Sequence, residues 1–213
     1  MTAQECDRFI YNNDTLYIVG IDGEGLFDPQ DHGIKVVPIS TACWRGYYCV
    51  YGILNNFLYL QEAYLGLDKE NERGIQKGNG IKLFGTTPHR YKYIDGEIVK
   101  IDISTNFNES KKINSAWDFR CDNLNQLIEF TGGILIGSNS MGRINSFPYN
   151  YSKVYELVFD AGRVVETSDR SQKMADFRHM LASNQLEFNT AEKYSQIENW
   201  LNQCFSWNYK RFI

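Results

Sequence analysis

The sequence predicts an α+β protein that is mainly β: an antiparallel, hairpin-built, curved sheet with two C-terminal helices packed on it. Four segments each join two runs of β-branched and aromatic residues through a tight turn. Aromatic residues make up 15% of the 213 residues, and they suit pleated strand surfaces. After about residue 169 the apolar spacing becomes helical. Strand order, and closure of the sheet into a barrel or a sandwich, are left open.

The four predicted hairpins cover residues 8–18, 50–60, 91–101 and 155–165. Their turns are Asn-Asn, Asn-Asn, Asp-Gly and Ala-Gly, which supply the positive φ angles that hairpin turns need. The second hairpin is apolar on both faces, so we expect burial on both sides. In the third, a three-residue loop that pairs Tyr91 with Val99 collects the apolar residues on one face. We therefore expect that register, with Arg90, Lys92 and Lys100 in solvent.

The remaining segments complete one domain over residues 1–213. Strands are expected at 34–39, 116–120, 126–130 and 133–137, and the charged, Gly-punctuated residues 68–80 are expected to form a surface loop and an internal seam. Capping-box patterns at Asp169 with Gln172 and at Asn189 with Glu192 predict two helix starts. After the second helix, alternating aromatic residues indicate an extended tail that adds to a sheet edge: Phe205, Trp207 and Tyr209.

Composition excludes several classes of protein. The net charge is −4 and the pI is about 5.4, which gives no general attraction for nucleic acid or anionic lipid. The N-terminus lacks the pattern of a signal peptide, and no apolar run is long enough to cross a membrane. Five unpatterned cysteines indicate reduced thiols, so we expect a cytoplasmic protein.

An acidic loop is the first candidate site. It carries Asp22, Glu24, Asp28 and Asp31, followed by His32, which are ligand types that cations accept. Their spacing lacks the Asp/Asn ladder and terminal Glu of a calcium-binding loop, so we expect these residues to be solvated turn residues and no metal to be bound. We also expect no cofactor, because no glycine-rich nucleotide motif is present.

Tyrosine and tryptophan concentrate around the second hairpin and form the other candidate site. Its residues are Trp44, Arg45, Tyr47, Tyr51, Tyr59 and His89. A curved sheet could use such rings to stack a ligand, and Tyr, Trp and Arg also dominate protein-binding surfaces. The competing interpretation is that these aromatic residues pack the core.

Two functional hypotheses follow. The first is a non-catalytic binding protein, whose partner is a protein, a small molecule, or a second copy joined through the aromatic C-terminal tail. The second is a hydrolase-like or metal-dependent enzyme that uses the acidic loop, or His89 with nearby carboxylates. We favour the first, because no nucleophile, histidine pair or metal motif has the spacing that catalysis needs.

Overall fold

The computed structural model describes residues 5–94, 97–101, 118–141, 147–183 and 193–209. In these ranges the protein is mainly β, with two of its three α-helices near the C-terminus, and this confirms the predicted α+β class. No helix there is long and apolar enough to cross a membrane. The strands are β1 Arg8–Tyr11, β2 Asp14–Glu24, β3 Tyr47–Leu54, β4 Phe57–Gly66, β5 His89–Ile94, β6 Glu97–Ile101, β7 Asp118–Cys121, β8 Gln126–Leu127, β9 Thr131–Ser140, β10 Tyr151–Asp160 and β11 Arg163–Asp169. The α-helices are α1 Lys69–Gln76, α2 Ser171–Ala182 and α3 Lys193–Asn202, and two short 3₁₀ helices cover Pro29–His32 and Pro148–Asn150.

The chain forms two compact units, which are described separately below. Unit 1 contains Met1–Glu5, Phe27–Gly52 and Tyr59–Leu127, and unit 2 contains Cys6–Leu26, Ile53–Leu58 and Ile128–Ile213. Residues 68–80, where the sequence placed a seam, lie wholly inside unit 1. That the two units make one domain stays a prediction.

In unit 1 the strand order is β3-β4-β7-β5-β6, and β8 pairs with β4. Pairing of Tyr64 with Arg120, and of Arg120 with His89, sets three strands side by side in register. Residues 48–52 of β3 are all buried, but the expected burial of the second hairpin on both faces is wrong near its turn, where Leu54 and Phe57 are exposed. The strand expected at 126–130 is only two residues long. Residues 128–130 do not continue this strand, because their backbone is hydrogen-bonded to two different segments: Ile128 N donates to Leu58 O, and Phe130 O accepts from Gly162 N.

The third hairpin differs from its prediction. Ile94 pairs with Glu97 and Tyr91 pairs with Lys100, so the register is that of a two-residue turn, and the predicted pairing of Tyr91 with Val99 is wrong. The turn residues 95–96 and the side chain of Lys92 lie outside the described part. The Asp-Gly sequence favours the two-residue turn. Because β5 also pairs with β7, the apolar residues of this hairpin alone do not set its register. Lys100 is exposed as expected, but Arg90 is half-buried and bound to Glu72.

The segment 34–39 is not a strand, contrary to the prediction. Val37 N donates to Gly66 O, at 2.9 Å, but no ladder follows. Pro38 has no N–H to continue one. The segment instead runs past the glycines at the end of β4 and before β3, where a Cβ at Gly66 would lie 2.1 Å from Val37 O.

Helix α1 replaces most of the loop expected at 68–80. Asp68 is its N-cap, and its carboxylate accepts from the backbone N–H groups of Glu70 and Asn71, at 3.1 and 2.9 Å. Glu70 and Glu72 in the first turn favour the positive end of the helix dipole. The acidic residues that made the segment look like a solvated loop therefore start a helix.

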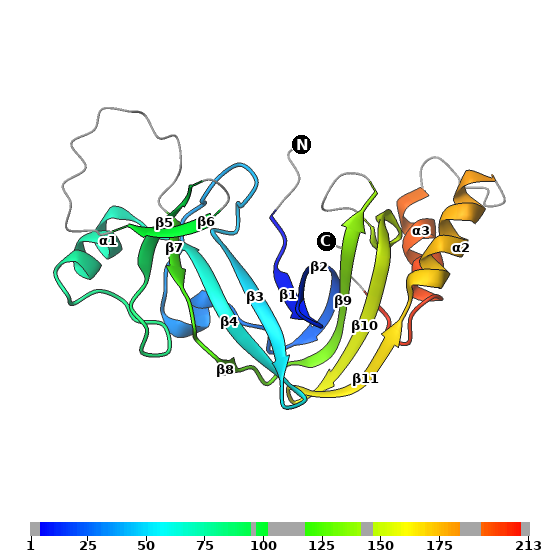
Figure 1. Ribbon diagram of the computed structural model, residues 1–213, viewed down its shortest axis with the longest axis horizontal. Coiled ribbons are helices and arrows are strands. Elements are labelled where there is room, and N and C mark those ends of the chain that lie inside the picture. The colour runs from blue at the N-terminus through cyan, green and yellow to red at the C-terminus, as the bar shows by residue number, and fades with distance from the viewer. Residues whose placement is uncertain (1–4, 95–96, 102–117, 142–146, 184–192, 210–213) are drawn as a thin grey trace. The chain divides into compact units, whose positions relative to one another are not determined.

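In unit 2 the strand order is β11-β10-β9-β2-β1 (Figure 1). Asn12 and Asn13, which join β1 to β2, have φ angles of 51° and 64°, and Ala161 and Gly162, between β10 and β11, have 44° and 80°. The first and fourth predicted hairpins are therefore confirmed, as is the Asn-Asn turn between β3 and β4. The strand predicted at 133–137 lies within β9 and is fully buried.

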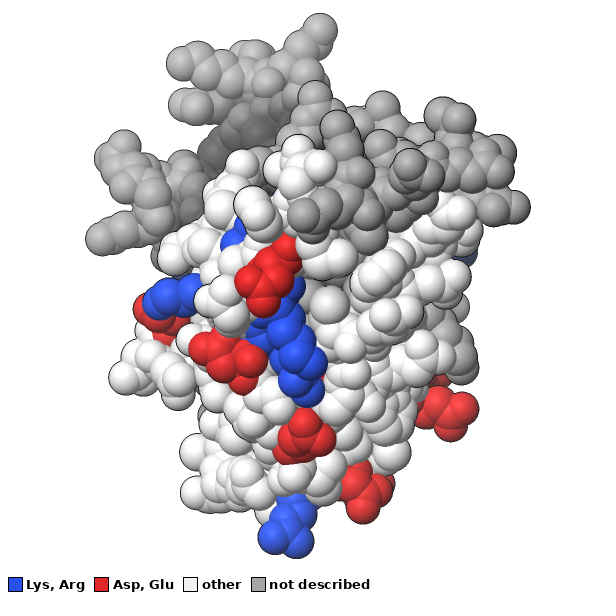
Figure 2. Space-filling model, turned by 90° about the vertical axis from the view of Figure 1, so that its right-hand side faces the viewer, with Lys and Arg blue, Asp and Glu red and all other residues white. Residues whose placement is uncertain are grey.

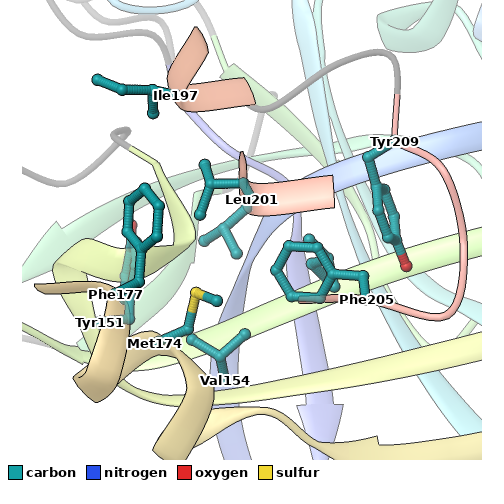
Figure 3. Packing of buried hydrophobic residues seen from close by; sticks show 10 residues of the cluster. Tyr151, Val154, Met174, Phe177, Ile197, Leu201, Phe205 and Tyr209 are labelled. Atoms are coloured by element: carbon teal, nitrogen blue, oxygen red, sulfur yellow. The ribbon is translucent and has the colours of Figure 1, made fainter. Parts of the chain in front are cut away.

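The core of unit 2 lies where α2 and α3 pack on the sheet, as predicted. Figure 3 shows side chains of both helices and of β10 pointing toward one another; the buried members include Val154, Met174, Phe177, Ile197 and Leu201. The capping box at Asp169 is wrong: Gln172 donates to Asp176 instead. The Asp169 carboxylate bonds Ser171 N two residues on, because Arg170 occupies the N-cap position. The start at Asn189 with Glu192 lies outside the described residues.

The C-terminal tail folds back on unit 2 instead of adding a strand. Phe205 and Tyr209 are buried in the core of this unit, and Trp207 is half-buried against it. A Cβ at Gly133 of β9 would lie 2.5 Å from Tyr209 Oη, so this glycine is what lets the tail approach the sheet. The Asn202 side chain donates to Tyr209 O and accepts from Tyr209 N, both at 2.8 Å. Trp207 Nε1 donates to the Asp22 carboxylate at 3.4 Å. Side-chain hydrogen bonds therefore hold the tail on unit 2, in place of the backbone hydrogen bonds of a strand.

Candidate functional site

The acidic loop is divided between structural tasks. Asp22 accepts from Trp207 in unit 2, and Asp28 accepts from Gln30 N at 2.9 Å as the N-cap of a 3₁₀ helix in unit 1. Glu24 ends β2, and Asp31 lies exposed in that 3₁₀ helix. In the described ranges, no three His, Cys, Asp or Glu residues are grouped so as to hold a metal ion.

The six aromatic-site candidates do not lie on one surface. Tyr51 is only 1% exposed and belongs to the core, while Tyr59 is half-buried. His89 is buried on β5. Trp44 and Arg45 are exposed and Tyr47 is half-buried, all in unit 1. The candidates therefore separate into a surface group and a group that lies on or under the sheet.

The surface group joins residues that the sequence did not connect. Phe27 is buried and supports the His32 ring, with centroids 5.2 Å apart and nearly parallel planes, and it also contacts the rings of Tyr47 and Phe84. His32 meets Phe84 edge-on at 4.8 Å. We call the exposed and half-buried members of this group the aromatic surface: His32, Trp44, Arg45, Tyr47 and Phe84.

Phe84 has a backbone conformation that is rare for an aromatic residue. Its φ is 49°, and Gly85 after it has a φ of 82°. Leu83 and Thr86 exchange two backbone hydrogen bonds of 2.9 Å around this pair, so the two residues form a tight turn. An L-residue in the left-handed region costs about 1–2 kcal/mol, and Phe lacks the short polar side chain that lets Asn adopt it. The turn nonetheless places a ring that is 37% exposed against His32.

A second tight turn presents Trp44 and Arg45. Gly46 has a φ of 78°, and a Cβ there would lie 2.6 Å from Val37 O, so only glycine fits. The Arg45 guanidinium lies 4.7 Å from the centre of the Tyr47 ring, and its Nε donates to Tyr47 O at 2.6 Å. Trp44 is 65% exposed, the most of any large apolar side chain in the described part. An arginine fixed on a ring beside an exposed tryptophan is typical of binding surfaces.

The buried histidine belongs to a different group on β4, β5 and β7. Tyr64 pairs with Arg120 and His89 pairs with Arg120, so the three side chains lie in one row across the sheet. Glu62 lies two positions before Tyr64 on β4, and Asp122 follows the end of β7, two positions after Arg120; both approach the Arg120 guanidinium. We call these five residues the polar row. Sequence reasoning missed four of them, although Glu-x-Tyr and Arg-x-Asp at alternating strand positions were a signal.

Charges in the polar row are partly compensated. Arg120 donates to both Glu62 oxygens, at 3.1 and 2.6 Å, and Tyr64 Oη donates to Glu62 at 2.7 Å. Asp122 Oδ2 is 3.7 Å from His89 Nε2 and 3.9 Å from Arg120 Nη1. Burial lowers the pKa of His89 below its usual 6.5, although the nearby Asp122 charge opposes this. The imidazole is therefore neutral at neutral pH.

The neighbouring thiol is not a nucleophile. Cys121 lies between Arg120 and Asp122 and so faces the other side of the sheet. Burial, with a smaller contribution from the Asp122 charge, raises the pKa of its thiol to about 12. A thiol with that pKa stays protonated at neutral pH and is inert.

Charge gives no further candidate on the face that Figure 2 draws. Figure 2 shows the face at the right-hand side of Figure 1, where basic side chains lie beside acidic ones and most of the described surface carries neither. Comparisons of the chain with models of protein families, with curated proteins and with solved structures find no match. The aromatic surface and the polar row of unit 1 are therefore the two candidate sites.

Proposed function

We propose that this protein is a non-catalytic binding protein and that a protein partner contacts the aromatic surface of unit 1. The observation that carries the proposal is the strained turn at Phe84, which holds an exposed ring against His32. Strain of this kind persists where the surrounding structure enforces it, and it is concentrated at functional sites. Contact with a partner would bury that exposed ring, which explains why the fold keeps it in this position.

The exposure of the aromatic surface favours a protein over a small molecule. Small ligands bind in concave sites that bury most of their surface. Trp44 and Phe84 instead extend into solvent, as residues of a protein-binding surface do before the partner arrives. Trp, Tyr and Arg are also the residue types that contribute most to such interfaces.

The compartment and the other partners follow from composition. All five cysteines are free thiols, which fits a reducing cytoplasm. The acidic balance argues against nucleic acid as a partner. Pairing with a second copy through the C-terminal tail stays a prediction, and it would have to use residues other than Phe205 and Tyr209, which are buried within unit 2.

An enzyme that uses the polar row is the second candidate, because an imidazole there faces a carboxylate. We prefer binding for two reasons. Glu62 is held by Arg120 and Tyr64, which keeps it from acting as a base. His89 and Asp122 are farther apart than a hydrogen bond, although such distances can shorten when a substrate binds.

The test uses two matched double variants. Trp44→Ala/Arg45→Ala removes one exposed apolar side chain and one arginine from the aromatic surface. The control Val165→Ala/Arg163→Ala also removes one exposed apolar side chain and one arginine, but from β11 in unit 2. A partner identified by capture with the unchanged protein is purified, and its affinity for each variant is measured by calorimetry. We expect the first variant to bind at least about 30-fold more weakly, the effect of losing one hot-spot residue, and the second to bind normally.

Failure of the proposal has a clear form. Equal affinities of both variants for the partner would show that the partner binds elsewhere. A catalytic activity of the unchanged protein that is lost in His89→Ala would favour the enzyme instead.

A further inference from the structure

We infer that Asp122 and His89 form a subsite for an N–H cation, a primary ammonium or a guanidinium group, on the polar row of unit 1. This inference goes beyond the proposed function and does not depend on the aromatic surface. It rests on three properties of the row: the position of its surplus negative charge, the spacing of its two acceptor atoms, and the exposure of Asp122.

The surplus charge lies at Asp122. The row contains two carboxylates and one guanidinium, and its imidazole is neutral, so the five residues carry −1; the exposed Lys100 of β6 is a further cation whose charge acts on His89. Arg120 and Tyr64 bond the oxygens of Glu62. Asp122 has no comparable partner among the described residues, since the neutral His89 Nε2 lies 3.7 Å and the cationic Arg120 Nη1 3.9 Å from its Oδ2. Both distances exceed those of a hydrogen bond.

The spacing suits a donor that carries several N–H groups. His89 Nε2 and Asp122 Oδ2 face each other across 3.7 Å, and a neutral imidazole can accept at one of its nitrogens. An ammonium has three donors and a guanidinium five, so either can bond both atoms at once. A divalent metal ion needs more protein ligands than these two, and no third His, Cys, Asp or Glu in the described part completes such a set.

Access comes from the Asp122 side. Its side chain is 33% exposed, whereas that of His89 is 11% exposed. A cation can therefore approach from solvent, bond the carboxylate first and then reach the imidazole. Arg120 lies on the ring of Tyr64, 5.7 Å from its centre, and so occupies that face of the ring itself.

The test is an NMR titration of the full chain with n-butylammonium chloride, with sodium chloride and sodium butyrate as controls at equal ionic strength. We expect saturable shifts of the His89 ring signals with butylammonium only. The bound cation should also lower the pKa of His89, since it disfavours the protonated imidazole.

Two variants with the same charge change locate the subsite. Asp122→Asn should weaken the apparent affinity at least tenfold, whereas Asp160→Asn, at the exposed end of β10 in unit 2, should leave it unchanged. If Asp122→Asn does not fold, His89→Phe, which removes the other acceptor, takes its place. Shifts that do not saturate, that sodium reproduces, or that persist in Asp122→Asn would each overturn the inference.

Discussion

Glu156 and Arg170 form a buried ion pair, in which a carboxylate with no exposed surface lies 2.7 Å from the guanidinium Nη2. The same carboxylate accepts from the backbone N–H groups of Ser206 and Trp207, at 3.0 Å each. Burial by itself would raise the pKa of Glu156, but these hydrogen bonds together lower it below its ordinary 4.5. An ionised group inside unit 2 thus holds the C-terminal tail.

Substitution of Arg170 by Ala should lower the free energy of unfolding by about 3 kcal/mol, because it leaves a buried carboxylate without its cation. The tail donors remain in place, which keeps the loss near the lower end of the range for broken buried pairs. Urea denaturation measures it, with the exposed Arg163→Ala as control, for which a change within about 0.5 kcal/mol is expected. Equal effects of both substitutions would contradict a stabilising role of the pair.

Acid should release the same contact. A carboxylate with a lowered pKa in the folded state stabilises the fold fully above its unfolded pKa, and this contribution disappears as pH falls through the folded value. We therefore expect unit 2 to lose stability below about pH 4.5, the ordinary value for Glu156. Denaturation curves between pH 6 and pH 3 should show a weaker pH dependence for Glu156→Gln.

Unit 1 should respond to pH in a different range. Burial lowers the pKa of His89 below 6.5, so the unfolded chain takes up a proton there before the folded chain does. Stability should therefore fall as pH drops below about 6.5, until the folded imidazole is also protonated. Asp122→Asn should lower the pKa of His89 further, because that carboxylate favours the charged ring. NMR titration of the ring signals tests both statements, and a pKa of 6.5 or above would contradict them.

Phe84→Asn should separate stability from binding. Asn adopts positive φ readily, so relief of about 1–2 kcal/mol of strain should largely offset the lost ring contacts with His32 and Phe27. Phe57→Asn is the matched control, because Phe57 is about equally exposed but lies in a strand without positive φ. Denaturation should show a larger loss for Phe57→Asn, while partner affinity should fall only for Phe84→Asn.

Gly133→Ala should dislodge the tail, because its Cβ would lie 2.5 Å from Tyr209 Oη. Overpacking of this kind costs about 1–3 kcal/mol. Tyr209→Phe removes the closest atom, so the double variant should recover part of the loss, as a double-mutant cycle measures. Strict additivity of the two changes would show that the tail does not contact Gly133 in solution.

The sequence predicted elements well where local chemistry decides the structure. Asn12-Asn13 and Ala161-Gly162 form turns because their conformational preferences are local. The register at Tyr91 was wrong because β5 has a second neighbour, which no local pattern reveals. Helix α1 was missed because Asp68 and Glu70 are equally common in solvated loops and in first helical turns.

The candidate site was predicted only in part for the same reason. Trp44, Arg45 and Tyr47 lie at or near the surface, whereas Tyr51 is in the core, since alternation along a strand does not reveal which face is covered. The only sequence feature that pointed to the turn at Phe84 was the glycine that follows it. The polar row depends on three strands that are distant in sequence, and their pairing brings His89 beside Arg120.

The bond of Trp207 with Asp22 joins the last described segment of the chain to β2, and the bonds of Tyr209 with Asn202 fix that segment on α3. Most proteins begin to open by fraying at their termini. A unit in which a strand near the start of the chain is bonded to its last described segment lacks that easy route. Amide protons of β2 and of residues 205–209 should therefore exchange with solvent in one cooperative event, and cutting the chain just before Ser206 should turn that event into many small ones.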